Sequence, residues 1–222
     1  MLGIVIIPIS RLVERYDIDL GVVLHLGAHL GEEADEYQCA HATEVIWVEA
    51  DPAIFERLAA AVRPYGHRAV QAVISDRDDA AATFFLTSND GKSSSLFPMK
   101  THVKEHPDVV VTGTTRLRTT AVDTLCAGHG ISTVDLLTMD LQGAELLALR
   151  GATRTLESVQ YVYTEVNVAE LYEGGAMLEE MDAHLADFVR QETALTPHGW
   201  GDAFYIRADR VPPGTDPRTW MA

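Results

Sequence analysis

Short apolar runs alternate with helical patterns along most of this chain, and this alternation limits the possible folds more than any other feature. The strand-length runs lie at residues 22–26, 44–49, 69–74, 134–139, 159–166 and 203–207. The helical patterns lie at 32–41, 51–63, 121–128, 144–149 and 177–190. Such βαβ units build a mainly parallel sheet with helices on both faces. We therefore expect a doubly wound α/β fold.

A single domain accommodates this alternation. The chain has 222 residues, of which 47% are hydrophobic, enough to bury the core of one compact α/β domain. We place the core at about residues 20–208 and a C-terminal tail at 209–222. From about 76 to 120 the pattern weakens into a β-rich segment, with short strands at 83–87 and 115–119. Such a segment is typical of an insertion over an active site.

Acidic residues outnumber basic ones, with 33 Asp and Glu against 17 Lys and Arg, and the formal net charge is −16. The average surface repels phosphate backbones and anionic lipids, so we expect neither nucleic acid nor a membrane as a partner. The apolar run at residues 1–7 is too short to span a bilayer, and Cys39 and Cys126 have neither zinc-site nor disulfide spacing. We expect a soluble, cytoplasmic protein whose N-terminal run packs onto the domain or forms a homo-oligomer interface.

A turn of small residues, Gly27-Ala28-His29-Leu30-Gly31, follows the first predicted strand. Glycine lets the backbone approach a ligand closely at such a turn, where helix amides point outward. The pyrophosphate fingerprint G-x-G-x-x-G is absent, which argues against a dinucleotide cofactor. Glu49 ends the second predicted strand, where a carboxylate can accept hydrogen bonds from both ribose hydroxyls of an adenosine. Together these features predict a nucleoside site.

Polar side chains also end two later strands of the predicted sheet. Asp140 and Gln142 follow the fourth strand, and Glu165 and Asn167 close the fifth. Open α/β sheets bind ligands in the crevice at the carboxyl ends of their strands, so we expect these polar groups to converge there. Such convergence is what catalysis on a small acceptor needs.

Five short blocks resemble the motifs of FkbM-type methyltransferases: residues 25–31 (HLGAHLG), 93–97 (SSSLF), 138–145 (TMDLQGAE), 163–167 (YTEVN) and 199–205 (GWGDAFY). The resemblance extends from about Val22 to Arg207. It implies a class I, Rossmann-like methyltransferase fold with S-adenosylmethionine as the methyl donor. It also implies O-methylation of a small molecule, such as a sugar or a glycosylated or polyketide-like natural product.

The same resemblance implies roles for individual residues. The donor-binding positions are His25, Gly27, Ala28, His29, Gly31, Glu49, Ala50, Val73, Ser75, Asp76 and Asp140. Many methyltransferases have an acidic residue at the position of His25, and His29 replaces a frequent Asn. The positions that would line the acceptor site are Ser94, His102, Gln142, Trp200 and Asp202.

Methyl transfer from a sulfonium is an in-line displacement, so the protein must align the reacting atoms and assist removal of the hydroxyl proton. The candidate catalytic residues are Asp140, Glu165 and Asn167, with the two carboxylates suited to acceptor orientation or base chemistry. The same carboxylates could hold a divalent cation such as Mg²⁺, because hard cations prefer oxygen ligands and lower the pKa of a coordinated hydroxyl. The sequence leaves this choice open.

Simpler interpretations also remain open. Asp140 could only cap the following helix, and His25 could be a core histidine between buried leucines. Residues 93–95 could form a flexible loop, and Trp200 could pack at a sheet edge. The functional alternatives are a nitrogen or carboxyl acceptor, a nucleotide-dependent oxidoreductase on the same scaffold, and a non-catalytic nucleoside-binding module.

Overall fold

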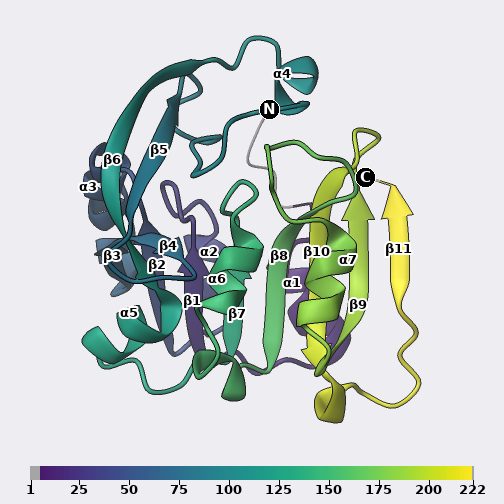
Figure 1. The fold of residues 1–222 in the computed structure, drawn as a ribbon. Helices are drawn as coiled ribbons and strands as arrows, with labels where there is room; N and C mark the ends of the chain where they lie inside the picture. Colours follow the sequence, from purple (N-terminus) through teal and green to yellow (C-terminus); the bar gives the residue numbers. More distant parts are fainter. Residues whose placement is uncertain (1–5, 222) are drawn as a thin grey trace.

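The computed structural model describes residues 6–221 and folds them around an eight-stranded sheet of order β11-β9-β10-β8-β7-β1-β2-β3 (Figure 1). Its strands are β1 (Val22–Leu26), β2 (Glu44–Glu49), β3 (Arg68–Gln71), β7 (Leu136–Met139), β8 (Tyr161–Asn167), β9 (Phe188–Leu195), β10 (Trp200–Arg207) and β11 (Arg218–Met221). The pairings from β3 to β8 are parallel, whereas β10 is antiparallel to both of its neighbours. The predicted doubly wound, mainly parallel α/β fold is confirmed.

Helices cover both faces of this sheet. One layer consists of α1 (Ile9–Tyr16), α2 (Ala34–Cys39) and α3 (Pro52–Val62), and the other of α5 (Val122–Gly128), α6 (Glu145–Arg150) and α7 (Leu178–His184). Short 3₁₀ turns lie at Arg63–Tyr65, Thr155–Glu157 and Ala208–Arg210. Successive residues of a strand face opposite sides, so Leu24 and Leu26 pack towards the α5–α7 layer and Val23 towards the α1–α3 layer.

The start of α3 follows from local sequence. Asp51 caps the helix, because its Oδ1 accepts the N–H groups of Ala53 at 2.8 Å and Ile54 at 3.4 Å. Pro52 occupies the first turn, where its missing N–H has no intrahelical partner to lose. This cap also fixes the direction in which the chain leaves Glu49 at the end of β2.

The predicted insertion forms a second sheet, of order β4-β6-β5. Its strands are β4 (Val73–Ser75), β5 (Ala81–Thr87) and β6 (Val111–Ala121), so the two predicted insertion strands are present and longer than expected. The single strand predicted at 69–74 is wrong, because the chain changes sheets at Ala72 and an unbroken apolar run carries no signal for a change of partner. Figure 1 shows the β5–β6 hairpin rising above the sheet, with α4 (His102–Glu105) near its upper end.

Both ends of the chain contain elements that differ from the prediction. The helix predicted at 177–190 ends at His184, and β9 begins at Phe188 and pairs with β10 and β11. The predicted tail contains β11, and α1 precedes the predicted core. Ile7 is fully buried, as expected of packing onto the domain, while residues 1–5 of the same run lie outside the described residues. Within residues 6–221, no helix has the length and apolarity needed to cross a membrane.

Candidate active site

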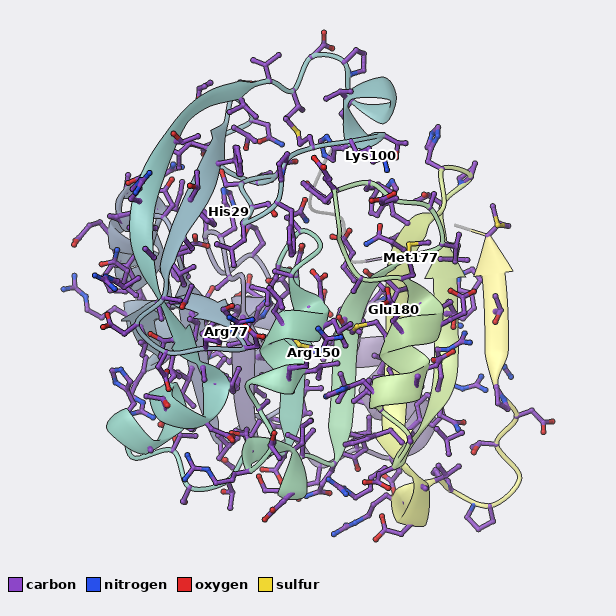
Figure 2. All side chains as sticks on the ribbon, in the orientation of Figure 1. His29, Arg77, Lys100, Arg150, Met177 and Glu180 are labelled. Atoms are coloured by element: carbon purple, nitrogen blue, oxygen red, sulfur yellow. The ribbon has the colours of Figure 1, made fainter. Side chains whose placement is uncertain are left out.

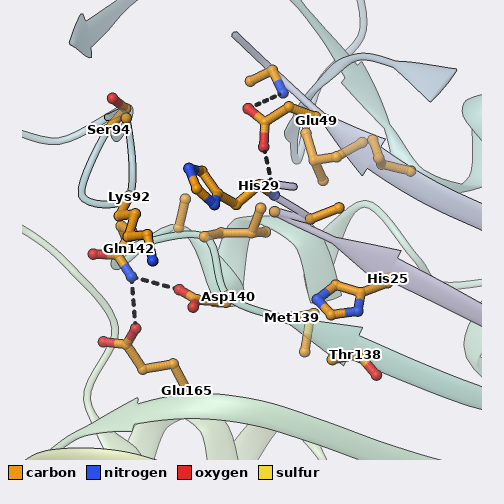
Figure 3. Close-up of a pocket in the computed structure, with 18 of the residues that line it drawn as sticks. His25, His29, Glu49, Lys92, Ser94, Thr138, Met139, Asp140, Gln142 and Glu165 are labelled. Carbon is orange, nitrogen blue, oxygen red and sulfur yellow. Dashed lines mark hydrogen bonds between the residues drawn. The ribbon is translucent and has the colours of Figure 1, made fainter. Parts of the chain in front are cut away.

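The main cavity lies at the carboxyl ends of β1, β2, β7 and β8, below the insertion, and has a volume of about 120 Å³. Its walls come from the turn after β1, the end of β2, the β3–β4 junction, the loop after β7 and residues 91–96 of the insertion. This is the edge at which the sequence predicted a ligand site. Figure 3 shows Glu49 near one end of this cavity and Asp140, Gln142 and Glu165 near the other.

Gly27 brings the turn after β1 against the end of β7. Its φ is +78°, and a Cβ there would lie 1.8 Å from the carbonyl oxygen of Asp140. The N–H groups of Gly27 and Ala28 both donate to the carbonyl of Val48 at 3.0 Å. Gly31 has a different task, because a Cβ there would lie 2.7 Å from Val62 on α3. Gly27 and Ala28 line the cavity as expected, whereas Gly31 is placed outside its lining.

Glu49 is held by backbone amides at the end of β2. Its Oε2 accepts the N–H of His29 at 2.9 Å, and its Oε1 accepts that of Ala50 at 2.8 Å (Figure 3). The same Oε1 also accepts the N–H of Asp51 at 2.8 Å. Burial raises the pKa of this carboxyl, and the three amides act in the opposite direction. An ionised carboxylate offers about four acceptor positions, so one position on Oε2 remains for a ligand hydroxyl. The residue therefore fits one of the two ribose contacts predicted from the sequence.

His25 and His29 have different environments. The His25 ring stacks on Trp47 with centroids 4.8 Å apart, and its Nδ1 lies 3.1 Å from the hydroxyl of Tyr37. Burial lowers the pKa of His25 to about 3, so its imidazole is neutral. It is a partnered core histidine whose ring reaches the cavity wall.

His29 instead links the turn after β1 to the insertion (Figure 2). Its Nδ1 lies 2.7 Å from Glu32 Oε1, and its Nε2 lies 2.9 Å from the carbonyl oxygen of Asp90. Burial lowers the pKa of His29, but these two acceptors outweigh it and raise the pKa overall. A charged imidazole can donate to both acceptors at once. In addition, Arg57 on α3 forms two hydrogen bonds with the carboxylate of Asp90.

A carboxyl pair faces the loop after β7. The Gln142 amide donates to Asp140 Oδ1 at 2.5 Å and to Glu165 Oε2 at 2.8 Å (Figure 3). The hydroxyl of Tyr172 donates to Gln142 Oε1 at 2.5 Å, which fixes the orientation of the amide. Gln142 itself has a φ of +54°, an unusual conformation for a residue with a side chain. Asp140 does not cap α6, whose N-cap residue is Ala144.

The two carboxyls of this pair hold a proton unequally. Burial raises the pKa of Glu165 well above its usual range, and the nearby Asp140 and Glu145 carboxyls raise it further. Burial also raises the pKa of Asp140, but hydrogen bonds from Glu165 and Gln142 act in the opposite direction. We assign the proton to Glu165, which leaves Asp140 as the ionised member of the pair.

Three further carboxyls lie near the pair: Glu33, Glu145 and Asp202. The prediction from sequence did not group these residues. Glu145 accepts the N–H groups of Leu141 at 2.7 Å and Gly143 at 3.3 Å, which fixes the loop after β7. Burial raises the pKa of Glu145 to about 7, that of Glu33 to about 7 and that of Asp202 to about 6. This region of the cavity therefore favours a cationic ligand.

The opposite end of the cavity is apolar. Ala50, Ala72, Val73, Ile74 and Phe84 line it. Of the predicted adenine-binding residues, Val73 is therefore in place, whereas Ser75 and Asp76 lie beyond the lining, where the Ser75 hydroxyl donates to Asp76. An apolar wall beside Glu49 suits a base attached to a ribose.

A smaller cavity, here called the side cavity, adjoins the main one and has a volume of about 50 Å³. It is lined by Lys92, Ser93, His102, His106, Asp140, Gln142, Glu165, Leu171, Trp200 and Asp202. Four of the five predicted acceptor residues line it, and the fifth, Ser94, lines the main cavity. Asn167, predicted to be catalytic, is buried at the end of β8 and lines neither cavity.

The carboxyl pair does not fit a metal site. Within residues 6–221, no three His, Cys, Asp or Glu side chains group closely enough to hold a metal ion. The amide nitrogen of Gln142 donates a hydrogen bond to one oxygen of Asp140 and to one oxygen of Glu165, so these two oxygens already have a partner. The Mg²⁺ expectation is therefore unsupported among the described residues.

Sequence reasoning missed several residues that shape the site. Glu33 and Glu145 could have been found, because each lies within two residues of a glycine in a motif block. Tyr172 and Lys92 lie in segments of weak pattern and carry no local signal. Their place in the site depends on the way the insertion folds back onto the β8 end of the sheet.

Comparison with known proteins agrees with this geometry. A family described as the methyltransferase FkbM domain matches residues 25–192. The chain belongs to the FkbM methyltransferase family. The matched region begins at β1 and ends in β9, so it contains the turn after β1, Glu49 and the carboxyl pair.

Two individual FkbM relatives extend this result. The chain is 30% identical over 161 residues to the 2-O-methyltransferase NoeI of Sinorhizobium fredii (strain NBRC 101917 / NGR234), an alignment covering 69% of this chain and 66% of that protein. The crystal structure of methyltransferase FkbM from Methylobacillus flagellatus KT matches with a TM-score of 0.54 and 15% identity, covering 85% of this chain and 44% of that one. The chain thus spans just under two thirds of the first relative and less than half of the second.

Proposed function

We propose that this protein transfers a methyl group from S-adenosylmethionine to a hydroxyl oxygen of a small molecule, such as a sugar or a glycosylated or polyketide-like natural product. The observation that carries the proposal is the polarity of the main cavity. An apolar slot and Glu49 lie at one end, and buried carboxyls at the other. A donor with a nucleoside at one end and a cationic sulfonium and ammonium at the other is complementary to both.

Individual residues would hold the donor along this axis. Val73, Ile74 and Phe84 would contact the adenine, and Glu49 Oε2 would accept a ribose hydroxyl. Because Gly27 has no side chain, the methionine part of the donor would be able to approach the backbone there. Asp140 would face the sulfonium, which supplies an electrophilic methyl group when the donor is bound.

The carboxyl pair would assist the acceptor. The hydroxyl oxygen of the acceptor forms a bond to the methyl carbon of the donor as the carbon–sulfur bond breaks, and the electron pair of that bond stays on sulfur. The hydroxyl proton passes to Asp140, the ionised member of the pair, while the protonated Glu165 donates a hydrogen bond to Asp140. The Gln142 amide, oriented by Tyr172, keeps the two carboxyls in register.

Oxygen as the acceptor atom is supported by the relative described as a 2-O-methyltransferase and by the carboxylate beside the reacting position. A nitrogen acceptor would also meet Asp140, whereas a carboxyl acceptor would bring a further negative charge to an already acidic wall. Repulsion between an acceptor carboxylate and the acidic wall makes the carboxyl acceptor the weaker alternative.

Calorimetric titration with S-adenosylhomocysteine tests the donor site without knowledge of the acceptor. We expect saturable one-site binding, no comparable binding of NAD, and a loss of affinity of about 10–100-fold in Glu49→Ala, the range for a hydrogen bond to a charged group. Glu44→Ala, at the other end of β2, is the matched control and should bind normally.

The outcomes separate the alternatives. Absence of S-adenosylhomocysteine binding by the folded wild-type chain would contradict the proposed function. Binding without methyl transfer to any acceptor would favour the non-catalytic nucleoside-binding module. Addition of EDTA should leave methyl transfer unchanged, because the carboxyl pair lacks the grouping of a metal site.

A further inference from the structure

The side cavity contains two buried ring nitrogens without a partner. His102 Nδ1 and Trp200 Nε1 have no hydrogen-bond partner among the described residues, although both atoms are shielded from solvent. The whole His102 side chain is 2% exposed. Buried polar atoms in folded proteins are nearly always satisfied, so unpaired nitrogens in two residues that line the same cavity indicate a ligand that completes them.

The two residues approach the cavity from separate parts of the chain. His102 begins α4 in the insertion, and Trp200 begins β10 beside the end of β8. The ring of His106 lies 4.9 Å from that of His102 and 6.5 Å from that of Trp200, and the ring of Tyr172 lies 5.4 Å from that of His102. Ring faces and ring nitrogens together suit a ligand that is apolar on its face and carries hydroxyls at its edge.

The charge of the side cavity limits the ligand further. Asp140, Glu165 and Asp202 line it, and its cationic residue, Lys92, has its Nζ 3.7 Å from the carboxylate of Glu32. Burial lowers the pKa of His102 to about 4, with a smaller contribution from His106, so His102 adds no positive charge near neutral pH. An acceptor with a carboxylate or phosphate beside its reacting hydroxyl would be repelled by Asp140 and Asp202, and Lys92 is already paired with Glu32.

The side cavity also opens onto the reacting groups. Five residues line both cavities: Lys92, Asp140, Gln142, Glu165 and Asp202. A molecule in the side cavity would therefore contact the same carboxyl pair that a molecule in the main cavity contacts. Transfer between two bound molecules requires such proximity.

We propose that the side cavity is the acceptor site and that it selects an uncharged polyhydroxy ring, with His102 Nδ1 and Trp200 Nε1 bonded to hydroxyls near the reacting one. The selection rests on the proposed methyl transfer, because it assigns a substrate class to the same site. Trp200 donates to a ring hydroxyl, and His102 exchanges a hydrogen bond with a second. The acidic wall rejects the corresponding acids.

Matched pairs of sugars test the selection by charge. The probes are methyl glycosides of glucose, galactose and mannose, each paired with its uronic acid, in which a carboxylate replaces the 6-hydroxymethyl group. Transfer of labelled methyl from S-adenosylmethionine by the full chain is measured for each. We expect at least one neutral glycoside to be methylated, at about tenfold or more the rate of its acid, given the cost of unpaired like charges. Equal or faster transfer to the acids would overturn the proposal.

Variants test the two ring nitrogens. His102→Phe and Trp200→Phe keep a ring and remove the nitrogens, and each should raise the KM for the best glycoside by about tenfold, the scale for a buried group left unpaired. Binding of S-adenosylhomocysteine should stay unchanged in both variants. Trp220→Phe on β11, far along the sheet edge, is the matched control and should leave KM unchanged.

The readouts distinguish this proposal from the proposed function. If S-adenosylhomocysteine binds but no neutral glycoside is methylated, or if both variants keep the wild-type KM, the acceptor assignment is overturned and the donor site stands. If S-adenosylhomocysteine does not bind to the wild-type chain, the proposed function itself has failed.

Discussion

At the residue scale, the unequal sharing of a proton between Asp140 and Glu165 determines which carboxyl can act as a base. Glu165 is buried, Asp140 is half-buried, and the amide of Gln142 donates to both. Because the pKa of Glu165 is the more strongly raised, it holds the proton and Asp140 holds the charge. A neutral amide can replace a protonated carboxyl more faithfully than an ionised one.

This difference predicts unequal effects of two isosteric variants. We expect Asp140→Asn to lower kcat by about 10²–10⁴-fold, the usual contribution of a general base. Glu165→Gln should lower it by less than about tenfold, because glutamine can still accept from Gln142 and donate to Asp140. Steady-state methyl transfer with both variants, checked for folding by thermal melting, measures the ratio. A larger loss in Glu165→Gln would assign the base to Glu165.

The sequence identified residues at strand ends more successfully than residues in the insertion. Glu49 and Asp140 could be predicted because the position of a residue after a parallel strand fixes its place at the crevice. Gly31 lies outside the cavity lining. Its lack of a side chain instead lets the turn pack closely against Val62 on α3. Tyr172 could not be predicted, because it lies in the irregular segment between β8 and α7 and its contact with Gln142 joins positions 30 residues apart.

At the element scale, α1 shows why a short helix escapes prediction. Its N-cap residue is Pro8, and no side chain of its own caps it. Instead Glu36 of α2 accepts the N–H groups of Ile9 at 2.7 Å and Ser10 at 3.4 Å. The signal that begins this helix thus lies 27 positions away in the chain. Isolated helices of this length are unstable in water, so tertiary contacts decide whether they form.

Removal of this distant cap should destabilise the protein. We expect Glu36→Ala to cost about 1 kcal/mol, the typical net value of a hydrogen bond, and to lower the melting temperature by about 2–4 °C. Glu14→Ala, on the exposed face of α1, should change the melting temperature far less. Equal shifts in the two variants would show that the contact of Glu36 with α1 does not stabilise the fold.

The predicted helix at 177–190 includes the first three residues of β9, for a related reason. Two of its polar residues, Gln191 and Glu192, are buried, so the strand lacks the usual alternation of apolar and polar side chains. The Oε1 atom of Glu192 lies 3.0 Å from the guanidinium of Arg15 and accepts the hydroxyl of Tyr16 at 3.1 Å, and both of these residues are on α1. In β1 and β2, by contrast, most residues are apolar and buried, and the predicted bounds of both strands match the observed ones.

At the scale of the whole molecule, the buried carboxyls couple ligand binding to pH. Burial raises the pKa of Glu33 and Glu145 to about 7, above the usual 4.5, and that of Asp202 to about 6. The folded protein therefore keeps protons that the unfolded chain has already released. The stability that these groups contribute is complete below about pH 4.5 and is lost as the pH rises through about 7.

A cation bound among these carboxyls should reverse the shift. Positive charge favours their ionised forms, lowers their pKa values and releases protons on binding. S-adenosylmethionine and S-adenosylhomocysteine form a matched pair for this effect, because both carry the same nucleoside and amino acid groups and only the first carries a sulfonium. Proton release should therefore be larger for the methyl donor than for its product.

Calorimetric titration at about pH 6.5, between the two groups of raised pKa values, measures this difference. The binding enthalpy in buffers of different ionisation enthalpy gives the number of protons released. We expect the donor to release a sizeable fraction of a proton more than the product, and Glu33→Gln to reduce that excess, while Glu44→Gln at the far end of β2 leaves it unchanged. Equal release by the two ligands would place the sulfonium away from the carboxyls, and with it the reacting methyl group away from Asp140.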